Sequence, residues 1–274
     1  MVVCRGDAVV FERYAPGIEP TSTLPSWSMA KSLLHLAIGV LAGEGRLALS
    51  TPAPVTGATI EDLLAMRDGL AWREDYVDGA HSDVQEMLWG TGREDMAAYV
   101  LARPVAQPPG AAFCYSSGTT NVLSAMVADV VGRGDPYLAW LRTAVLEAAG
   151  MPSAVPRLDG AGVWVASSFC FTPAREVAAL GQGLLDGGRG WLPEGWLATG
   201  TARRSRDEDG EGYGLHWWVP DGDLGTFEAR GYDGQSLTVV PALDLVVVRM
   251  GRTPATRAAE LRAWRRSVIA AAQA

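Results

Sequence analysis

The sequence predicts an α/β (α+β) protein in which an antiparallel sheet is flanked by helices and an all-helical subdomain is inserted. Three observations support this prediction. Strand patterns occur near the start of the chain and again after residue 214, whereas the middle has apolar residues at helical spacing. Strands at both ends with helices between them are typical of a sheet assembled from the two termini. With 274 residues, the chain is long enough to bury a substantial core.

The first fifty residues predict a hairpin followed by a buried helix. Apolar stretches at 2–4 and 8–13 flank a polar turn. Apolar residues then recur at helical spacing over 29–42, and Gly43 follows as a stop signal. Ser28 therefore stands at the start of a largely buried helix.

The remaining elements follow from the same signals. Thr59 and Asp62 form a capping-box pattern that opens a short helix ending near Met66. Helical patterns then dominate, and the last part of the chain returns to strands before an Ala- and Arg-rich terminal helix. The expected helices cover 82–102, 119–132, 135–149, 173–185 and 256–273, and the expected strands cover 214–219, 227–230, 236–240 and 245–250.

This order predicts one compact unit made of two subdomains. Residues 1–50 and 160–274 are expected to form the sheet subdomain, and residues 51–159 the mainly helical one. The sequence contains no internal repeat and no low-complexity linker between them.

Composition and charge exclude several classes of protein. The net charge is −8 and the arginines are scattered, which is unlike the basic stripe of a nucleic-acid-binding protein. No apolar run approaches the roughly 20 residues of a membrane span. The first residues lack the pattern of a signal peptide, which predicts a cytoplasmic protein. We therefore expect a small-molecule substrate as the partner, and neither nucleic acid nor a membrane; the sequence leaves the oligomeric state open.

The cysteines and the basic residues differ in what they indicate. Cys4, Cys114 and Cys170 are odd in number and lack metal-ligand spacing, so they predict buried small side chains and neither a disulfide framework nor a zinc site. Of 23 basic residues, Lys31 is the only lysine. A guanidinium does not give up its proton in a protein, whereas a desolvated ammonium does, so the single lysine is a candidate for proton transfer.

Ser28-Met29-Ala30-Lys31 places a hydroxyl and an amine three residues apart at the start of the predicted helix. Such residues share one helix face, so both groups can meet in one cleft. A buried lysine with a lowered pKa can take the proton from a serine nucleophile, and the helix N-terminus supplies N–H groups for an oxyanion, one of them from Ser28. The structural alternative is that Ser28 caps the helix and Lys31 is solvated.

Two later segments can complete such a site. Tyr115 and Ser117 lie in a turn just before a helix, where a tyrosine close to an ammonium can become a phenolate and move protons. Gly231 precedes Tyr232 at the end of a predicted strand, which makes the Tyr232 N–H our candidate for the second oxyanion donor. The structural alternatives are a turn anchored by Tyr115 and an ordinary glycine-rich hairpin.

With these three segments in this order, the chain resembles the serine β-lactamase and penicillin-binding protein superfamily, whose motifs include Ser-x-x-Lys. It is most similar to the class C branch and to 6-aminohexanoate-dimer hydrolase-like enzymes. The phrases that carry the resemblance span nearly the whole chain: Ser26-Trp27-Ser28-Met29-Ala30-Lys31-Ser32, Leu63-Leu64-Ala65-Met66-Arg67-Asp68-Gly69, Tyr115-Ser116-Ser117-Gly118-Thr119-Thr120-Asn121 and Gly231-Tyr232-Asp233-Gly234-Gln235.

The resemblance implies a serine hydrolase of a small amide or ester, built on the β-lactamase-like fold. It implies Ser28 as the nucleophile, Lys31 and Tyr115 as the coupled base system, and the Ser28 and Tyr232 amides as the oxyanion hole. It implies no metal and no cofactor. An acyltransferase that passes the acyl group to an amine or alcohol has the same motifs, and a non-catalytic ligand-binding homologue is the second alternative.

The sequence also departs from the family pattern. Position 117 is serine where the class C pattern has asparagine, and Ala229-Arg230-Gly231 stands where the pattern has Lys-Thr-Gly. The lysine of that motif holds the β-lactam carboxylate, so its replacement predicts weak or absent β-lactamase activity. Arg230 is a candidate substitute for the lost cation.

Substrate contacts are predicted from position beside these motifs. Aromatic walls with a carboxylate would suit a small amide or ester with a cationic end. The candidate contacts are Ser117, Tyr76, Trp217, Trp218, Arg230, Gly231 and Asp233.

The nearest rival mechanism is a Ser-His-Asp hydrolase. The chain has three histidines and no Gly-x-Ser-x-Gly elbow. His35 falls inside the first predicted helix among leucines, and His81 falls in a loop. His216 is the one histidine that the sequence places near the expected cleft.

Overall fold

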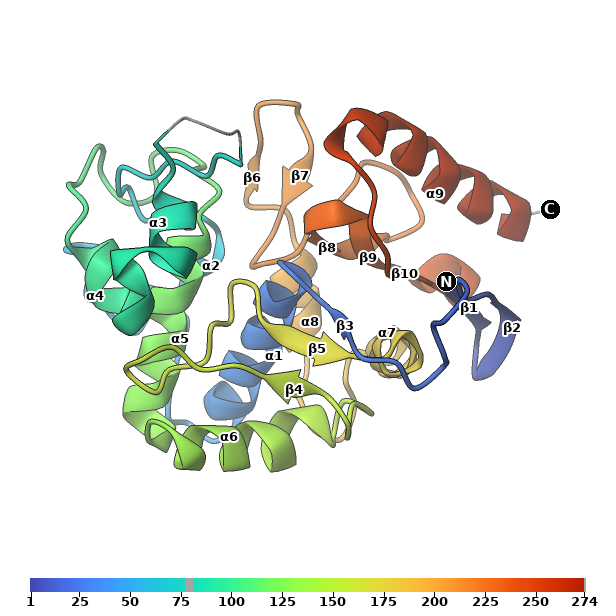
Figure 1. Ribbon diagram of the computed structural model, residues 1–274, viewed down its shortest axis with the longest axis horizontal. Helices are drawn as coiled ribbons and strands as arrows, with labels where there is room; N and C mark the ends of the chain where they lie inside the picture. Colours follow the sequence, from blue (N-terminus) through green and yellow to red (C-terminus); the bar gives the residue numbers. More distant parts are fainter. Residues whose placement is uncertain (77–80, 274) are drawn as a thin grey trace.

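Strands from both ends of the chain form one antiparallel sheet in the computed structural model, which describes residues 1–76 and 81–273. The strand order is β2-β1-β10-β9-β8 (Figure 1). Because β1 pairs with β10, the two termini are joined in the middle of the sheet, which confirms the predicted architecture. The strands are β1 (Val2–Arg5), β2 (Ala8–Glu12), β8 (Phe227–Gly231), β9 (Gln235–Val240) and β10 (Leu245–Arg249).

Helices cover both faces of this sheet (Figure 1). On one face, α9 (Ala258–Gln273) packs Trp264 and Ile269 over a small core that includes Val240 and Val247. On the other face lie α7 (Ala174–Leu185) and the much more buried α1 (Met29–Gly43). Both faces of this sheet carry apolar side chains, so each face is covered by helices.

Helix α1 lies in the centre of the molecule, between the sheet and the helical region. Leu34, Leu36, Ala37 and Ile38 are all fully buried, so successive residues, and not only one stripe, face protein. A polar side chain in the first turn of this helix is therefore also buried. This placement determines the chemistry of Lys31.

The helical region contains shorter helices than the sequence pattern predicted. The capping box of Thr59 and Asp62 is confirmed at the start of α2 (Ile60–Leu64). The single helix predicted over 82–102 is wrong: Gly90 ends one helix and the Asp95 side chain caps the next. The elements found there are α3 (Asp83–Trp89), η1 (Thr91–Glu94) and α4 (Met96–Leu101), followed by α5 (Ser117–Val131), α6 (Asp135–Leu141) and the π-turn η2 (Arg142–Leu146).

A small antiparallel sheet, which the sequence pattern did not predict, includes the strand that directly precedes α1. β3 (Leu24–Pro25) pairs with β5 (Cys170–Thr172), and β5 pairs with β4 (Val155–Pro156). Two- and three-residue strands are too short to leave a periodic signal. The short helix α8 (Trp196–Thr201) follows α7.

The strand predicted over 214–219 is wrong. The paired residues are β6 (Ser205–Arg206) and β7 (Gly212–Tyr213), and from there to β8 only isolated bridges involve Trp218. The amide of His216 donates to the carbonyl of Leu64 in α2, and φ of His216 is 61°, so this apolar segment is held against neighbouring helices and not in a ladder.

Within the described ranges, no helix is both long and apolar enough to cross a bilayer. Residues 1–76 and 81–273 also contain no group of three or more His, Cys, Asp or Glu side chains arranged to hold a metal ion. Cys4, Cys114 and Cys170 are free thiols. The division into residues 1–50 with 160–274 and residues 51–159 stays a prediction.

Candidate active site

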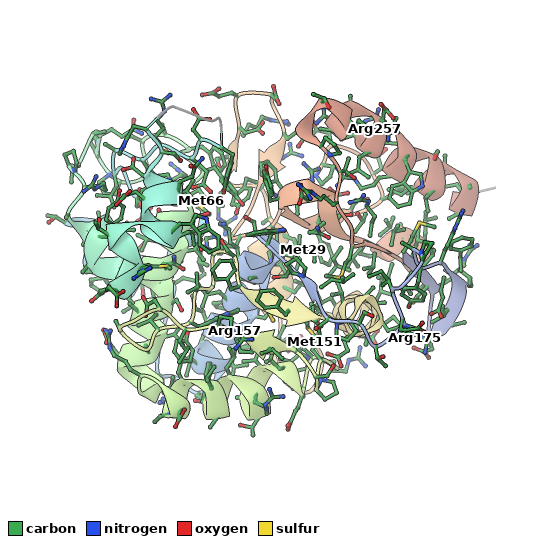
Figure 2. All side chains as sticks on the ribbon, viewed as in Figure 1. Met29, Met66, Met151, Arg157, Arg175 and Arg257 are labelled. Carbon is green, nitrogen blue, oxygen red and sulfur yellow. The ribbon has the colours of Figure 1, made fainter. Side chains whose placement is uncertain are left out.

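The side chain of Ser28 lies at the start of α1 but does not cap the helix. Ser28 occupies the N-cap position, but its side chain makes no capping hydrogen bond. Trp27 before it has φ of 47°, a left-handed conformation that is costly for an aromatic residue. The Ser26 hydroxyl donates to the Trp27 carbonyl at 3.1 Å and supports this bend. Figure 2 shows Met29, the residue after Ser28, in the middle of the molecule.

Lys31 is buried, with 1% of its surface exposed, and its ammonium has three oxygen partners. Nζ donates to Ser28 Oγ at 3.0 Å and to Ser117 Oγ at 3.0 Å. The third bond goes to the Ser167 carbonyl at 2.9 Å. All three partners are neutral groups, and within residues 1–76 and 81–273 no carboxylate bonds the ammonium directly.

Burial lowers the pKa of Lys31 to about 8, and the nearby Glu74 charge partly opposes this shift. Removal from water disfavours the charged form of an amine. An amine that titrates near neutral pH is suited to accept and return a proton.

Tyr115 lies beside these groups as a neutral phenol. Lys31 Nζ is 5.0 Å from the centre of its ring, and the ring stacks on Trp218. Burial and the Glu74 charge raise the pKa of Tyr115, although hydrogen bonding with Ser28 acts in the other direction. The phenolate considered for Tyr115 is therefore disfavoured at neutral pH, and the phenol is a hydrogen-bond donor.

Ser117 joins Lys31 to a carboxylate that the sequence motifs did not single out. Ser117 is fully buried at the start of α5, and its hydroxyl donates to Glu74 Oε1 at 2.5 Å while its amide donates to Oε2 at 2.9 Å. Trp72 Nε1 and the Tyr76 hydroxyl complete four donors to the same carboxylate. Tyr76 is a candidate contact from the sequence, but no periodicity orients this loop, so only its position near Tyr76 could have indicated Glu74.

The junction between β8 and the short helix η3 (Tyr232–Gly234) brings the predicted second oxyanion donor against the start of α1. A Cβ at Gly231 would lie 2.4 Å from the Ser26 carbonyl oxygen and 3.1 Å from Trp27 Cβ, so only glycine permits this approach. The Tyr232 ring contacts Trp27 at 5.9 Å and Tyr76 at 5.0 Å between centroids. The Tyr232 backbone thus adjoins the turn that presents Ser28.

Two predicted aromatic contacts have different environments. Trp218 stacks on Tyr115 with ring centroids 5.9 Å apart. Trp217 is fully buried and donates from Nε1 to His35 Nδ1 at 3.0 Å, so it packs in the core away from the cleft. Trp217 and Trp218 therefore point to opposite sides of this segment. A β-strand, which the sequence pattern predicted here, would also place two successive side chains on opposite sides.

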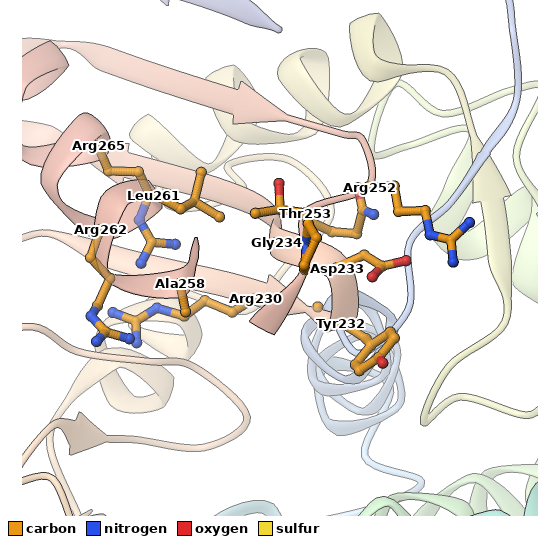
Figure 3. Close-up of a pocket in the computed structure, with 13 residues that line it drawn as sticks. Arg230, Tyr232, Asp233, Gly234, Arg252, Thr253, Ala258, Leu261, Arg262 and Arg265 are labelled. Carbon is orange, nitrogen blue, oxygen red and sulfur yellow. The ribbon is translucent and has the colours of Figure 1, made fainter. Parts of the chain in front are cut away.

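The structure does not bring Arg230 to the Ser28 side of the junction. Its guanidinium binds Glu211 and binds Glu228 at 2.5 Å, and Figure 3 shows its side chain pointing away from Tyr232. Arg230, Tyr232 and Asp233 all line the cavity drawn in Figure 3, and Asp233, with φ of 60°, lies on the Tyr232 side of it. Because two carboxylates already occupy Arg230, it is a poor replacement for the missing lysine as an anion clamp.

The histidines occupy structural positions. The His216 ring contacts the Leu64 carbonyl at 2.9 Å and Thr120 Oγ1 at 3.1 Å. Burial, followed by the Lys31 charge, holds the pKa of His216 well below its ordinary value, and burial lowers the pKa of His35 to about 3. His81 is paired with Asp83. None of these rings contacts Ser28 in the described part of the chain.

Known proteins share both sequence and fold with this chain. A 6-aminohexanoate-dimer hydrolase of Paenarthrobacter ureafaciens is 31% identical over 289 residues, which cover 92% of this chain and 72% of that protein. A putative 6-aminohexanoate-dimer hydrolase from Bacillus anthracis superposes with a TM-score of 0.82 at 21% identity, covering 99% of this chain and 78% of that one. A penicillin-binding protein from Bacillus halodurans gives 0.79 at 19% identity, covering 97% and 95%. Because the beta-lactamase family model matches residues 1–272 as well, the chain belongs to the beta-lactamase family.

Proposed function

We propose that this protein is a serine hydrolase that cleaves a small amide or ester through an acyl-enzyme on Ser28. The observation that carries the proposal is the buried Lys31 Nζ at 3.0 Å from Ser28 Oγ, with a pKa lowered to about 8. The hydrolase names of relatives in the same family support the reaction class. An N-cap serine whose side chain does not cap is also free to react.

Acylation begins when Lys31 is the neutral amine. It accepts the Ser28 proton while Ser28 Oγ bonds to the carbonyl carbon, and the carbonyl electrons move onto oxygen. The Ser28 and Tyr232 amides stabilise this oxyanion. When the oxyanion collapses, the bond to the leaving group breaks, and the proton held by Lys31 passes to it directly or through the Tyr115 hydroxyl.

Deacylation repeats the proton transfers with a second nucleophile. In the hydrolase, Lys31 takes a proton from water as the water oxygen attacks the acyl carbon, and then returns it to Ser28 Oγ. In an acyltransferase, an amine or alcohol takes the place of water. The resting site is the same in both cases, so product analysis distinguishes them.

β-Lactams fit this site less well than simple esters and amides. Ala229 stands where the family pattern has its lysine, and it is buried in a cluster with Met29 and Leu33. Arg230 is held by Glu211 and Glu228. We therefore expect weak or absent turnover of nitrocefin.

The experiment compares wild type with Ser28→Ala, using a fluorophosphonate probe and p-nitrophenyl acetate and butyrate. We expect a mass adduct at Ser28 and nitrophenol release for wild type, and neither for the variant. Addition of amines during turnover then shows whether acyl transfer competes with hydrolysis. Ser22→Ala, a change at a partly exposed serine on the segment before β3, is the matched control. If neither protein labels or releases nitrophenol, the chain is better described as a non-catalytic binding homologue, and equal activity of both would mean that Ser28 is not the nucleophile.

A further inference from the structure

An aromatic cavity adjoins the segment that presents Ser28. Its volume is about 700 Å³, and Trp27, Trp89, Phe169 and Phe171 are among its lining residues. The rings contact one another, with centroids 5.4 Å apart for Trp89 and Phe169 and 6.0 Å apart for Trp27 and Phe169. Small-molecule sites are hollows of this size with mainly apolar walls.

Two chain segments connect this cavity to the reacting groups. Trp27 immediately precedes Ser28. Ser167 accepts a hydrogen bond from Lys31 Nζ at 2.9 Å, and two residues later Phe169 forms the cavity wall. A substrate whose carbonyl lies at Ser28 therefore has this cavity beside it.

Trp89 leaves a large apolar surface exposed in this cavity. It stands at the end of α3 with 61% of its surface exposed, whereas Leu88 and Met96 below it are 6% and 3% exposed. An exposed indole next to buried apolar side chains is typical of a surface that a ligand covers.

The polar groups at the rim are already engaged. Asp159 accepts hydrogen bonds from the backbone amides of Met96 and Val163, and Arg93 pairs with Glu94. Arg157 lies over the Phe171 ring at 6.0 Å. The lining therefore favours an uncharged, flat group over a charged one.

We propose that this cavity is a subsite for an aromatic group of the ester or amide substrate. The proposal rests on the proposed function, because it uses Ser28 as the point where the substrate is attached. A ring in the cavity contacts Trp27 and Phe169 edge-to-face or offset and covers the exposed face of Trp89. The ring belongs to either the acyl part or the leaving group, and the experiment separates these two sources.

The acyl arm compares p-nitrophenyl phenylacetate with p-nitrophenyl acetate, and the leaving-group arm compares benzyl acetate with ethyl acetate. In one arm, we expect the ring to raise kcat/KM by about tenfold or more, because an apolar group of this size is removed from water. Trp89→Ala should remove most of that ratio. Phe11→Ala, which removes an exposed aromatic side chain from β2, should leave the ratio as in wild type.

A binding measurement tests the cavity without turnover. Ligand-detected NMR with benzyl alcohol on Ser28→Ala should give a saturable signal that is lost when Trp89→Ala is added. If hydrolysis of the acetates proceeds but neither arm prefers the ring, or if benzyl alcohol binds equally with and without Trp89, the subsite is wrong. Absence of Ser28 labelling and of acetate hydrolysis instead contradicts the proposed function, and the NMR result still decides the subsite.

Discussion

The two largely buried cations near the cleft, Lys31 and Arg230, differ in the partners that the fold gives them. Lys31, at the start of α1, bonds three neutral oxygens. Arg230, at the end of β8, binds two carboxylates, Glu211 and Glu228. Burial lowers the pKa of Lys31 to about 8. Burial acts the same way on Arg230, but the charges of Glu228 and Glu211 outweigh it and raise the pKa.

The difference teaches which buried charge can do chemistry. A cation held by carboxylates stays charged and contributes to structure, whereas a cation held by neutral acceptors changes charge near neutral pH. Trp218 separates the two regions, because its ring stacks on Tyr115 and also lies 5.0 Å below the Arg230 guanidinium. The ionic cluster thus supports a wall of the site without sharing its protons.

Exchanging the cations gives the largest expected effect. Lys31→Arg keeps a positive charge but removes the base, so we expect kcat/KM for p-nitrophenyl acetate to fall on the order of 10³-fold. Arg230→Lys keeps a cation in a structural cluster, so we expect kcat/KM to stay within about threefold of wild type. Circular dichroism checks that both variants are folded. Equal losses in the two variants would mean that the lysine does not serve as a base.

Breaking the ionic cluster at Glu228 should affect stability more than activity. Glu228 is 3% exposed, binds Arg230, accepts from Thr238 at 2.9 Å and lies 3.7 Å from Arg265. Glu228→Gln leaves two buried guanidinium groups without this charge, so urea unfolding should show a free energy of unfolding lower by about 3 kcal/mol. Glu260→Gln, at an exposed pair on α9, is the control and should change little.

The pH dependence of that difference has a definite sign. Burial raises the pKa of Glu228, but the Arg230 and Arg265 charges and the hydrogen bonds from Arg230 and Thr238 outweigh it, so the pKa in the folded protein is lowered. The stabilisation is therefore present above the unfolded pKa of about 4.3 and is lost as pH falls through the folded value. The gap between wild type and Glu228→Gln should be full at pH 7 and shrink toward pH 3; a gap independent of pH would contradict the ionic origin.

The sequence predicted the elements with long or repeated signals. The terminal strands, α1 and α5 follow apolar periodicity, and the pairing of β1 with β10 follows from strands at both ends. Lys31 was predicted from its motif and from being the only lysine, and the structure places it beside Ser28. These features are local in the chain or repeat along it, so a single sequence contains them.

The features that the sequence did not predict depend on tertiary contacts. The β3-β5-β4 sheet has strands of two or three residues, and the segment 214–219 has apolar residues but forms isolated bridges at Trp218 and no continuous ladder. Glu74 reaches Ser117 across 43 positions of chain. The partners of Arg230 come from β8 and from the loop before β7. Its position in the Ala229-Arg230-Gly231 motif therefore did not predict these ion pairs.

The smallest expected effect concerns Glu74, the carboxylate that the Ser117 hydroxyl links to Lys31. Its charge raises the pKa of Lys31 against the larger effect of burial. The amine form of Lys31 accepts the Ser28 proton, so kcat/KM should rise as pH passes through about 8. Glu74→Gln removes a charge that stabilises the ammonium, so the acidic limb of the kcat/KM profile should move to lower pH.

A purely structural Glu74 would give a different profile. If the carboxylate only orders Trp72, Tyr76 and Ser117, its replacement lowers kcat/KM by the same factor at every pH and leaves the limb in place. Glu260→Gln, at a surface pair with Arg257, controls for the change in net charge. A limb that moves in Glu74→Gln and not in Glu260→Gln shows that the Glu74 charge acts on Lys31 although the two groups are not directly paired. Lys31 then differs from Arg230 in the distance to its carboxylate, because direct pairing fixes the charge and an intervening serine only adjusts it.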